Sequence, residues 1–139
     1  NPDDNDWVFV HDAARPCLDR DSVERLKEAI ESEAIDGAIL AMPVTDTIKW
    51  VSSSGLIEKT IDRSHCYRAQ TPQVFRAAAL RAALSQAKGT VTDEASAMET
   101  QNAKIRIVEG SAFNIKVTYP DDIEIVRNYL LNSVQRKDY

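Results

Sequence analysis

The residues with the clearest chemical potential lie in the segment His11–Pro16, with the sequence HDAARP. Asp12 and Arg15 stand three residues apart there, directly after the apolar, β-prone run Trp7–Val10. In open α/β sheets, ligands bind just outside the carboxyl ends of the strands. An aspartate at such a place can hold a metal or a hydroxyl, and the planar fork of an arginine fits phosphate. A strand end with two solvated charges explains these six residues equally well.

Further polar clusters occur at predicted strand ends and turns. They are Asp46, Thr47 and Lys49; Asp62, Arg63 and His65; Thr71; Thr92, Asp93 and Glu94; and Lys116 and Thr118. Several cations beside several hydroxyls indicate an anionic small-molecule ligand, a phosphate in the first place. Each cluster also has a plainer explanation, such as a helix start at Thr92–Glu94. Lys116 points most clearly to an anion, because it lies between apolar neighbours next to a predicted helix start.

The elements that must position these residues begin with two apolar runs joined by a helix. Trp7–Val10 and Gly37–Met42 are predicted strands that are apolar on both faces, which is typical of a parallel sheet covered by helices. The helix between them is predicted to start at Asp19 or Asp21 and to run to about Glu33. This strand, helix and strand form a βαβ unit, so the sequence predicts an α/β fold.

A hairpin interrupts this pattern at about residues 46–62. Asp46–Val51 and Leu56–Ile61 are β-prone, and Ser52–Gly55 is a turn signal between them. An isolated two-stranded hairpin is marginal in water. We therefore expect an arm, at about residues 44–70 of a single domain spanning 1–139, that projects from the sheet and builds a homodimer.

Downstream, the predicted elements alternate between helices and strands. Thr71–Phe75 leads into a helix that is capped by Gly89, and a second helix over Glu94–Gln101 is capped by Thr92 or Asp93. Ile105–Val108 is a predicted strand, and Asn114–Val117 is a brief one. A final helix begins at Thr118 and is predicted to turn four apolar residues inward, namely Ile123, Val126, Leu130 and Val134.

Composition excludes several classes of protein. The net charge of −5 argues against generic nucleic-acid binding, and no apolar run reaches the length of a membrane span. Cys17 and Cys66 form no metal-binding or disulfide pattern, so we expect reduced thiols and a cytoplasmic location. The four glycines form neither a dinucleotide fingerprint nor a P-loop. The chain starts at Asn1 and reaches a strand almost at once, from which we expect that an upstream part is absent.

Six motifs occur in an order that resembles one enzyme family, the 2-C-methyl-D-erythritol 4-phosphate cytidylyltransferases. The motifs are Val10–Pro16 (VHDAARP), Pro43–Lys49 (PVTDTIK), Thr60–Arg63 (TIDR), Thr71–Phe75 (TPQVF), Thr92–Ser96 (TDEAS) and Asn114–Thr118 (NIKVT). The resemblance covers almost the whole chain after Asp6. It implies a Rossmann-like nucleotidyltransferase fold with a mostly parallel sheet, and it places the family's glycine-rich nucleotide loop in the part expected to be absent.

The resemblance also implies a reaction and a set of site residues. The phosphate of methylerythritol phosphate attacks the α-phosphate of CTP, pyrophosphate leaves, and Mg²⁺ neutralises the triphosphate. Arg63 and Lys116 would hold the attacking phosphate as the catalytic pair. The substrate-binding residues would be Asp12, Ala13, Arg15, Thr47, Thr71 and Thr92, with Asp12 also near the metal. Thr47 and Arg63 would belong to an arm that reaches into the other subunit's site.

Two other functions compete with this one. A cytidylyltransferase for another sugar phosphate, such as ribitol 5-phosphate, would share the fold, the arm and parts of the motifs. Ala13–Ala14 before Arg15, and the pair Asp46–Thr47, favour methylerythritol phosphate. The second alternative is of a different class: a dimerising fragment that folds and assembles without catalysing a reaction.

Overall fold

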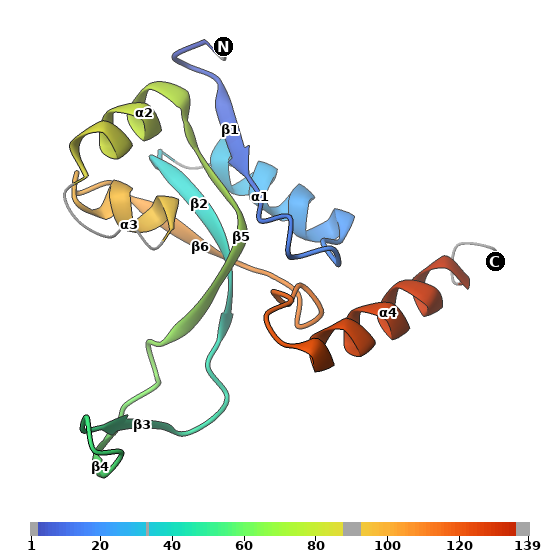
Figure 1. Ribbon diagram of the computed structural model, residues 1–139. Helices are drawn as coiled ribbons and strands as arrows, with labels where there is room; N and C mark the ends of the chain where they lie inside the picture. Colours follow the sequence, from blue (N-terminus) through green and yellow to red (C-terminus); the bar gives the residue numbers. More distant parts are fainter. Residues whose placement is uncertain (1–2, 33, 88–92, 136–139) are drawn as a thin grey trace.

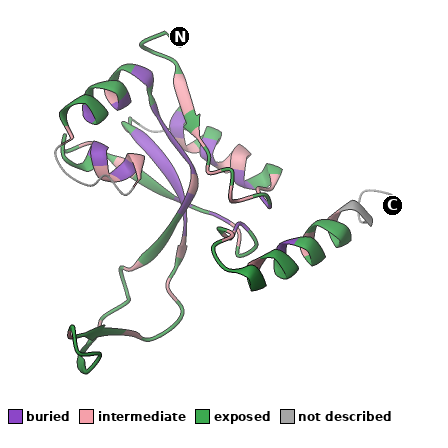
Figure 2. Cartoon of the chain, in the orientation of Figure 1, coloured by how far each residue is buried: buried purple, intermediate pink, exposed green. Residues whose placement is uncertain are grey.

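The main sheet of the protein has four strands and is covered by helices on both faces. In the computed structural model, which describes residues 3–32, 34–87 and 93–135, the strand order is β1 (Trp7–Val10), β5 (Tyr67–Arg76), β2 (Gly37–Pro43) and β6 (Ile105–Glu109) (Figure 1). Buried residues concentrate along β2 and the second half of β5 (Figure 2). The packed centre of the sheet therefore lies along these two strands.

The sheet is mixed, with three of its four strands running in one direction. β1 and β2 are both antiparallel to β5, and β6 is parallel to β2, so β1, β2 and β6 share a direction. This confirms the α/β fold with a mostly parallel set of strands. The predicted βαβ unit is present, but β5 lies between its two strands, so β1 and β2 are not neighbours.

β5 corrects the prediction that Thr71–Phe75 leads directly into a helix, because these residues form the second half of a ten-residue strand. Pro72 obscured the strand, since proline has no N–H for a sheet ladder and is confined to edges and irregularities. Here the pairing with β1 ends at Gln73, and the pairing with β2 shifts register between Ile39 and Ala41. Pro72 lies at the place where neither neighbour requires its missing N–H.

Alternating side chains of the central strands feed two apolar clusters. Helix α1 (Arg20–Ser32) places Leu26 and Ile30 in one cluster with Ala38, Leu40, Val74 and Val108. Helices α2 (Ala77–Gln86) and α3 (Glu94–Glu99) form the other cluster with Ile39 and Phe75. Successive strand residues point to opposite faces of a sheet. A strand that is apolar throughout is therefore buried on both sides.

The predicted hairpin is confirmed as a separate two-stranded sheet. Strands β3 (Ile48–Val51) and β4 (Ile57–Ile61) pair antiparallel, and the arm that they form extends away from the main sheet (Figure 1). The side chains of Trp50 and Ile57 are 58% and 65% exposed. The arm therefore has no apolar core of its own.

Helix α4 (Pro120–Gln135) also leaves the body of the fold (Figure 1). Val126 is buried, but Ile123 and Leu130 are exposed, so the predicted inward face is wrong for those two residues. The side chain of Val134, the predicted cap Gly89 and the predicted binder Thr92 lie outside the described residues. None of the described helices is long and apolar enough to cross a membrane.

We predict that Gly37→Ala destabilises the protein by about 1–3 kcal/mol, because it overpacks the sheet. A Cβ at residue 37 would lie 2.2 Å from Cδ1 of Phe75 and 2.6 Å from the carbonyl oxygen of Val74. Urea unfolding would measure the change. Gly55→Ala in the arm is the control: nothing lies within 4 Å of its Cβ, and only its φ of 81° opposes the substitution. An equal or smaller loss for Gly37→Ala would contradict the packing argument.

Candidate active site

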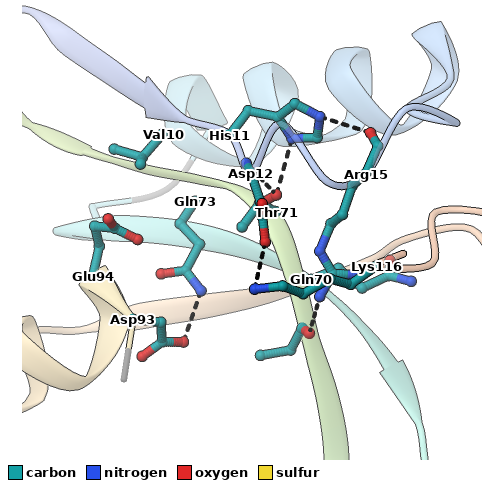
Figure 3. A pocket seen from close by; sticks show the side chains of 11 residues that line it. Val10, His11, Asp12, Arg15, Gln70, Thr71, Gln73, Asp93, Glu94 and Lys116 are labelled. Atoms are coloured by element: carbon teal, nitrogen blue, oxygen red, sulfur yellow. Dashed lines mark hydrogen bonds and ion pairs between the residues drawn. The ribbon is translucent and has the colours of Figure 1, made fainter. Parts of the chain in front are cut away.

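A polar cavity of about 580 Å³ opens where β1 ends beside the middle of β5 (Figure 3). Its lining residues are Val10, His11, Asp12, Arg15, Ala69, Gln70, Thr71, Gln73, Asp93, Glu94 and Lys116. Four of the eight predicted site residues are among them, namely Asp12, Arg15, Thr71 and Lys116. They come from three segments that are far apart in the sequence, so the fold assembles the cavity.

A tight turn over Asp12–Arg15 fixes one wall of the cavity. The Arg15 N–H donates to the carbonyl of Asp12 over 2.9 Å, and the Ala14 N–H donates to Oδ1 of Asp12 over 3.0 Å. The Asp12 N–H donates to Oγ1 of Thr71 on β5, also over 3.0 Å. The turn is therefore closed by its own aspartate and pinned to the neighbouring strand.

The carboxylate of Asp12 forms an ion pair with Lys116, whose Nζ lies 2.8 Å from Oδ2. The hydrogen bond from Lys116, helped by the Ala14 N–H, holds the pKa of Asp12 below its ordinary value. The side chain of Lys116 remains 54% exposed, whereas that of Asp12 is 27% exposed. Asp12 thus stays ionised at neutral pH and directs an accessible ammonium group into the cavity.

The segment that carries Lys116 is a loop, which corrects the predicted strand over Asn114–Val117. It pairs with none of the described strands, and two of its backbone groups bond to the turn. The Val117 N–H donates to the carbonyl of Ala14 over 2.8 Å, and Nη1 of Arg15 donates to the carbonyl of Asn114 over 2.8 Å. These contacts place Lys116 opposite Asp12.

The guanidinium of Arg15 bonds mainly to the protein backbone and is not free to bind a ligand through both of its terminal nitrogens. Besides the bond to Asn114, its Nη2 donates to the carbonyl of Ala69 over 3.3 Å. Burial lowers the pKa of Arg15, although the nearby Asp12 carboxylate partly opposes that shift. Two donors of the guanidinium are therefore committed to backbone carbonyls, and its charge stays beside the cavity.

Several lining residues were not singled out from the sequence. Gln73 is 1% exposed; its Nε2 donates to Oδ2 of Asp93 over 2.8 Å, and its Oε1 accepts from the Ala95 N–H over 2.8 Å. Asp93 also caps α3 by accepting from the Ser96 N–H. Gln73 lies within a recognised motif, but a buried amide that joins a strand to a helix start has no signature in composition or spacing.

The remaining predicted residues do not line this cavity. Thr47 precedes β3 and Arg63 follows β4, and both are exposed on the projecting arm (Figure 1). Ala13 is exposed in the turn. Thr92 lies outside the described residues, next to Asp93, which does line the cavity. Within one chain, the arm and the cavity are thus separate.

The described residues contain no group of three or more His, Cys, Asp or Glu that could hold a metal ion. Asp12 offers a single carboxylate, with Oδ2 near Lys116 and Oδ1 bonded to Ala14. Mg²⁺ in phosphate-transfer sites often takes only one or two carboxylates, with water and substrate phosphates supplying its other ligands. Asp12 could therefore supply one ligand to a metal whose other ligands are water and phosphate oxygens, whereas the described residues do not form an all-protein metal cage.

Comparison with known proteins gives a consistent result. Residues 1–132 match the family model described as IspD: 2-C-methyl-D-erythritol 4-phosphate cytidylyltransferase. The protein of that name from Pseudomonas fluorescens (strain Pf0-1) is 46% identical over 133 residues, which are 94% of this chain and 56% of that protein. The chain therefore spans little more than half the length of this relative.

Solved structures agree with the sequence match. A crystal structure of 4-diphosphocytidyl-2C-methyl-D-erythritol synthase is 44% identical, with a TM-score of 0.82 over 92% of this chain and 58% of that one. The 2-C-methyl-D-erythritol 4-phosphate cytidylyltransferase of Francisella tularensis is 39% identical, with a TM-score of 0.78 over 89% of this chain and 59% of that one.

We predict that Lys116→Met raises the pKa of Asp12 toward its ordinary value, because the substitution removes the ammonium that stabilises the carboxylate. A carbon-detected NMR titration of the carboxyl group would measure the change. Lys27→Met is the matched control, since Lys27 pairs with Glu24 on α1. An unchanged Asp12 pKa in Lys116→Met would contradict the assigned cause.

The same pair should affect stability in a defined pH window. The folded-state pKa of Asp12 is lowered, so its contribution is present above the ordinary aspartate value of about 3.9 and is lost as pH falls through the lowered pKa. The difference in unfolding free energy between the protein and Lys116→Met should therefore be largest near neutral pH and shrink below about pH 4. Urea unfolding at several pH values would test this.

Proposed function

This chain belongs to the 2-C-methyl-D-erythritol 4-phosphate cytidylyltransferase family, and on that premise we propose that its protein transfers a cytidylyl group from CTP to 2-C-methyl-D-erythritol 4-phosphate, as a step of non-mevalonate isoprenoid biosynthesis. One observation carries the proposal within the chain. The cavity joins Asp12, Arg15, Thr71 and Lys116, which come from three of the family-like motifs, in one polar site.

In the proposed reaction, the phosphate of the sugar attacks the α-phosphate of CTP in line, and pyrophosphate leaves. Such a transfer depends on positioning and charge stabilisation more than on covalent help. We assign Lys116 to the attacking phosphate, because its ammonium is exposed to the cavity while Asp12 holds it in place. Arg15 adds positive charge behind it, and Thr71 supplies a hydroxyl at the cavity wall.

Mg²⁺ is a proposed companion of the nucleotide, with one oxygen of Asp12 as its ligand from this chain. When bound, such an ion neutralises charge on the triphosphate. The role of the chain in this proposal is to keep Asp12 ionised, which the bonds from Lys116 and Ala14 favour. Lys116 would then turn from the carboxylate to the incoming phosphate.

The arm is proposed to act across a homodimer. Arg63 would hold the attacking phosphate and Thr47 would contact the substrate, yet neither lines the cavity of its own chain. The exposed apolar side chains of the arm, including Trp50 and Ile57, give it a reason to rest on another subunit. A second subunit would thus satisfy the arm and complete the site together.

Partners and location follow as further parts of the proposal. The ligands are CTP and a sugar phosphate, and the net charge of −5 makes nucleic acid a poor partner. Cys17 and Cys66 are free thiols, which supports a reducing, cytoplasmic setting. Ribitol 5-phosphate is the alternative substrate, and it is compared with 2-C-methyl-D-erythritol 4-phosphate in the activity measurements below.

We predict that Lys116→Ala and Arg63→Ala each lower turnover by about 10²–10³-fold in a protein of the relatives' length that contains this chain, because each removes one electrostatic stabiliser. Steady-state kinetics with CTP and each sugar phosphate would measure this, with circular dichroism to confirm folding. Lys27→Ala, which removes a cation on α1, is the control and should keep its activity. Unchanged turnover in Lys116→Ala would overturn its assignment. The 139-residue chain alone should be inactive or nearly so.

We predict a homodimer in sedimentation experiments. The double substitution Trp50→Ser and Ile57→Ser should weaken the dimer, because it removes apolar side chains of the arm that would contact the other subunit. A monomer at high micromolar concentration would count against dimerisation through the arm.

If the arm crosses between subunits, mixing Arg63→Ala protein with Lys116→Ala protein should restore part of the activity. Absence of complementation would mean that Arg63 works in its own subunit.

A further inference from the structure

His11 lies at the mouth of the cavity with both ring nitrogens engaged, and the proposed reaction gives it no role. Its Nε2 lies 3.0 Å from the carbonyl oxygen of Arg15, and its Nδ1 lies 2.9 Å from Oγ1 of Thr71 (Figure 3). Thr71 also accepts from the Asp12 N–H. The ring therefore contacts the last residue of the turn directly, and the first through Thr71.

The chemistry of the partners sets the direction of every bond when the ring is neutral. A carbonyl oxygen can only accept, so Nε2 must carry the proton that it gives to Arg15. The neutral ring then has a bare Nδ1, which can only accept. Thr71 must donate its hydroxyl proton to Nδ1, while its oxygen accepts from the Asp12 N–H. The chain of bonds runs from Asp12 through Thr71 and His11 to Arg15.

These hydrogen bonds link the two ends of the turn that holds the proposed active-site residues Asp12 and Arg15. The turn is already bridged by the Arg15 N–H to the carbonyl of Asp12. His11 adds a second bridge over the outside of the turn, anchored on β5 through Thr71. Opening the turn would require breaking both the Arg15–Asp12 backbone bond and the bridge through His11. The Asp12 carboxylate, which orients Lys116, is therefore held in place before substrate binds.

We propose that His11 is a positioning residue that preorganises the Asp12–Arg15 turn for the transfer reaction; this inference rests on the proposed function. His11 does not touch the reacting atoms in this assignment. It also commits the hydroxyl proton of Thr71, so a bound phosphate can take that proton only by displacing the bond to His11. Preorganisation of this kind raises the rate without adding a contact to substrate.

Single substitutions distinguish the two hydrogen bonds of the His11 imidazole, one to Arg15 and one to Thr71. His11→Gln places an amide near the Nε2 position and can still donate to the carbonyl of Arg15, but offers nothing to Thr71. His11→Ala removes both bonds. Thr71→Val removes the hydroxyl at nearly constant shape, and Thr71→Ser restores it. Lys27→Ala is the control, because the exposed ammonium of Lys27 pairs with Glu24 on α1 and belongs neither to the turn nor to the arm.

Amide hydrogen exchange in the 139-residue chain is the first readout, and it requires no substrate. In His11→Ala the Arg15 amide should exchange about threefold to tenfold faster, as expected for loss of one neutral hydrogen bond. His11→Gln should recover most of the Arg15 protection. Thr71→Val should expose the Asp12 amide, and Thr71→Ser should not. Unchanged exchange at Arg15 in His11→Ala would overturn the proposal.

Kinetics in a protein of the relatives' length form the second readout. His11→Ala should lower kcat about tenfold, with a melting temperature equal to that of Lys27→Ala and with partial rescue in His11→Gln. Faster exchange with unchanged kcat, or a kcat loss that only follows the melting temperature, would also overturn positioning. If the unsubstituted protein transfers no cytidylyl group to any sugar phosphate, the proposed function fails by itself, and the exchange results then decide the role of His11 in the turn.

Discussion

The two-sided pairing of β5 is the constraint on which the rest of the structure depends. This strand leaves the arm at Tyr67 and places Phe75 in the core. Between them it supplies Ala69, Gln70, Thr71 and Gln73 to the cavity. It bonds to β1 on one side and to β2 on the other. Because one strand joins arm, site and core, the position of the cavity is set by the same backbone bonds that hold the sheet together.

Buried polar groups tie the loops of the site to that strand. Gln70 donates to the carbonyls of Ser111 and Asn114, and Asn114 donates to the carbonyl of Thr71. In a low-dielectric interior such bonds are strong and fix one arrangement. Three buried atoms of this network, Nε of Arg15, Oε1 of Gln70 and Oδ1 of Asn114, have no partner among the described residues. The network therefore serves geometry more than stability.

The distribution of apolar surface divides the chain into a packed body and two extensions. The body buries apolar side chains on both faces of the sheet, which supplies the main favourable term in folding. The arm and α4 instead leave residues such as Trp50, Ile57 and Leu131 exposed. Clustered apolar surface of this kind is typical of interaction sites, which is why the arm is proposed to rest on a second subunit.

The sequence by itself determined the features that depend on local pattern. The unbroken apolar run of Gly37–Met42 predicted a strand buried on both faces, and Ser52–Gly55 predicted the hairpin turn. Asp19 and Asp21 were the two predicted starts of α1, and Asp19 is the one that accepts from the Ser22 N–H. Ordered motifs also identified Asp12, Arg15, Thr71 and Lys116 before their shared cavity was known. These features follow from side-chain periodicity, capping and turn chemistry, which act over a few residues.

Tertiary structure alone decided the features that depend on distant partners. Pro72 masked β5, and only the end of β1 and the register shift in β2 make a proline acceptable there. Asn114–Val117 has a strand-like sequence but bonds to the turn as a loop, and Ile123 stays exposed because α4 leaves the sheet. The roles of Gln73 and His11 likewise depend on partners at least 20 residues away, Asp93 and Thr71. Local sequence cannot encode such pairings, because they exist only once the chain has folded.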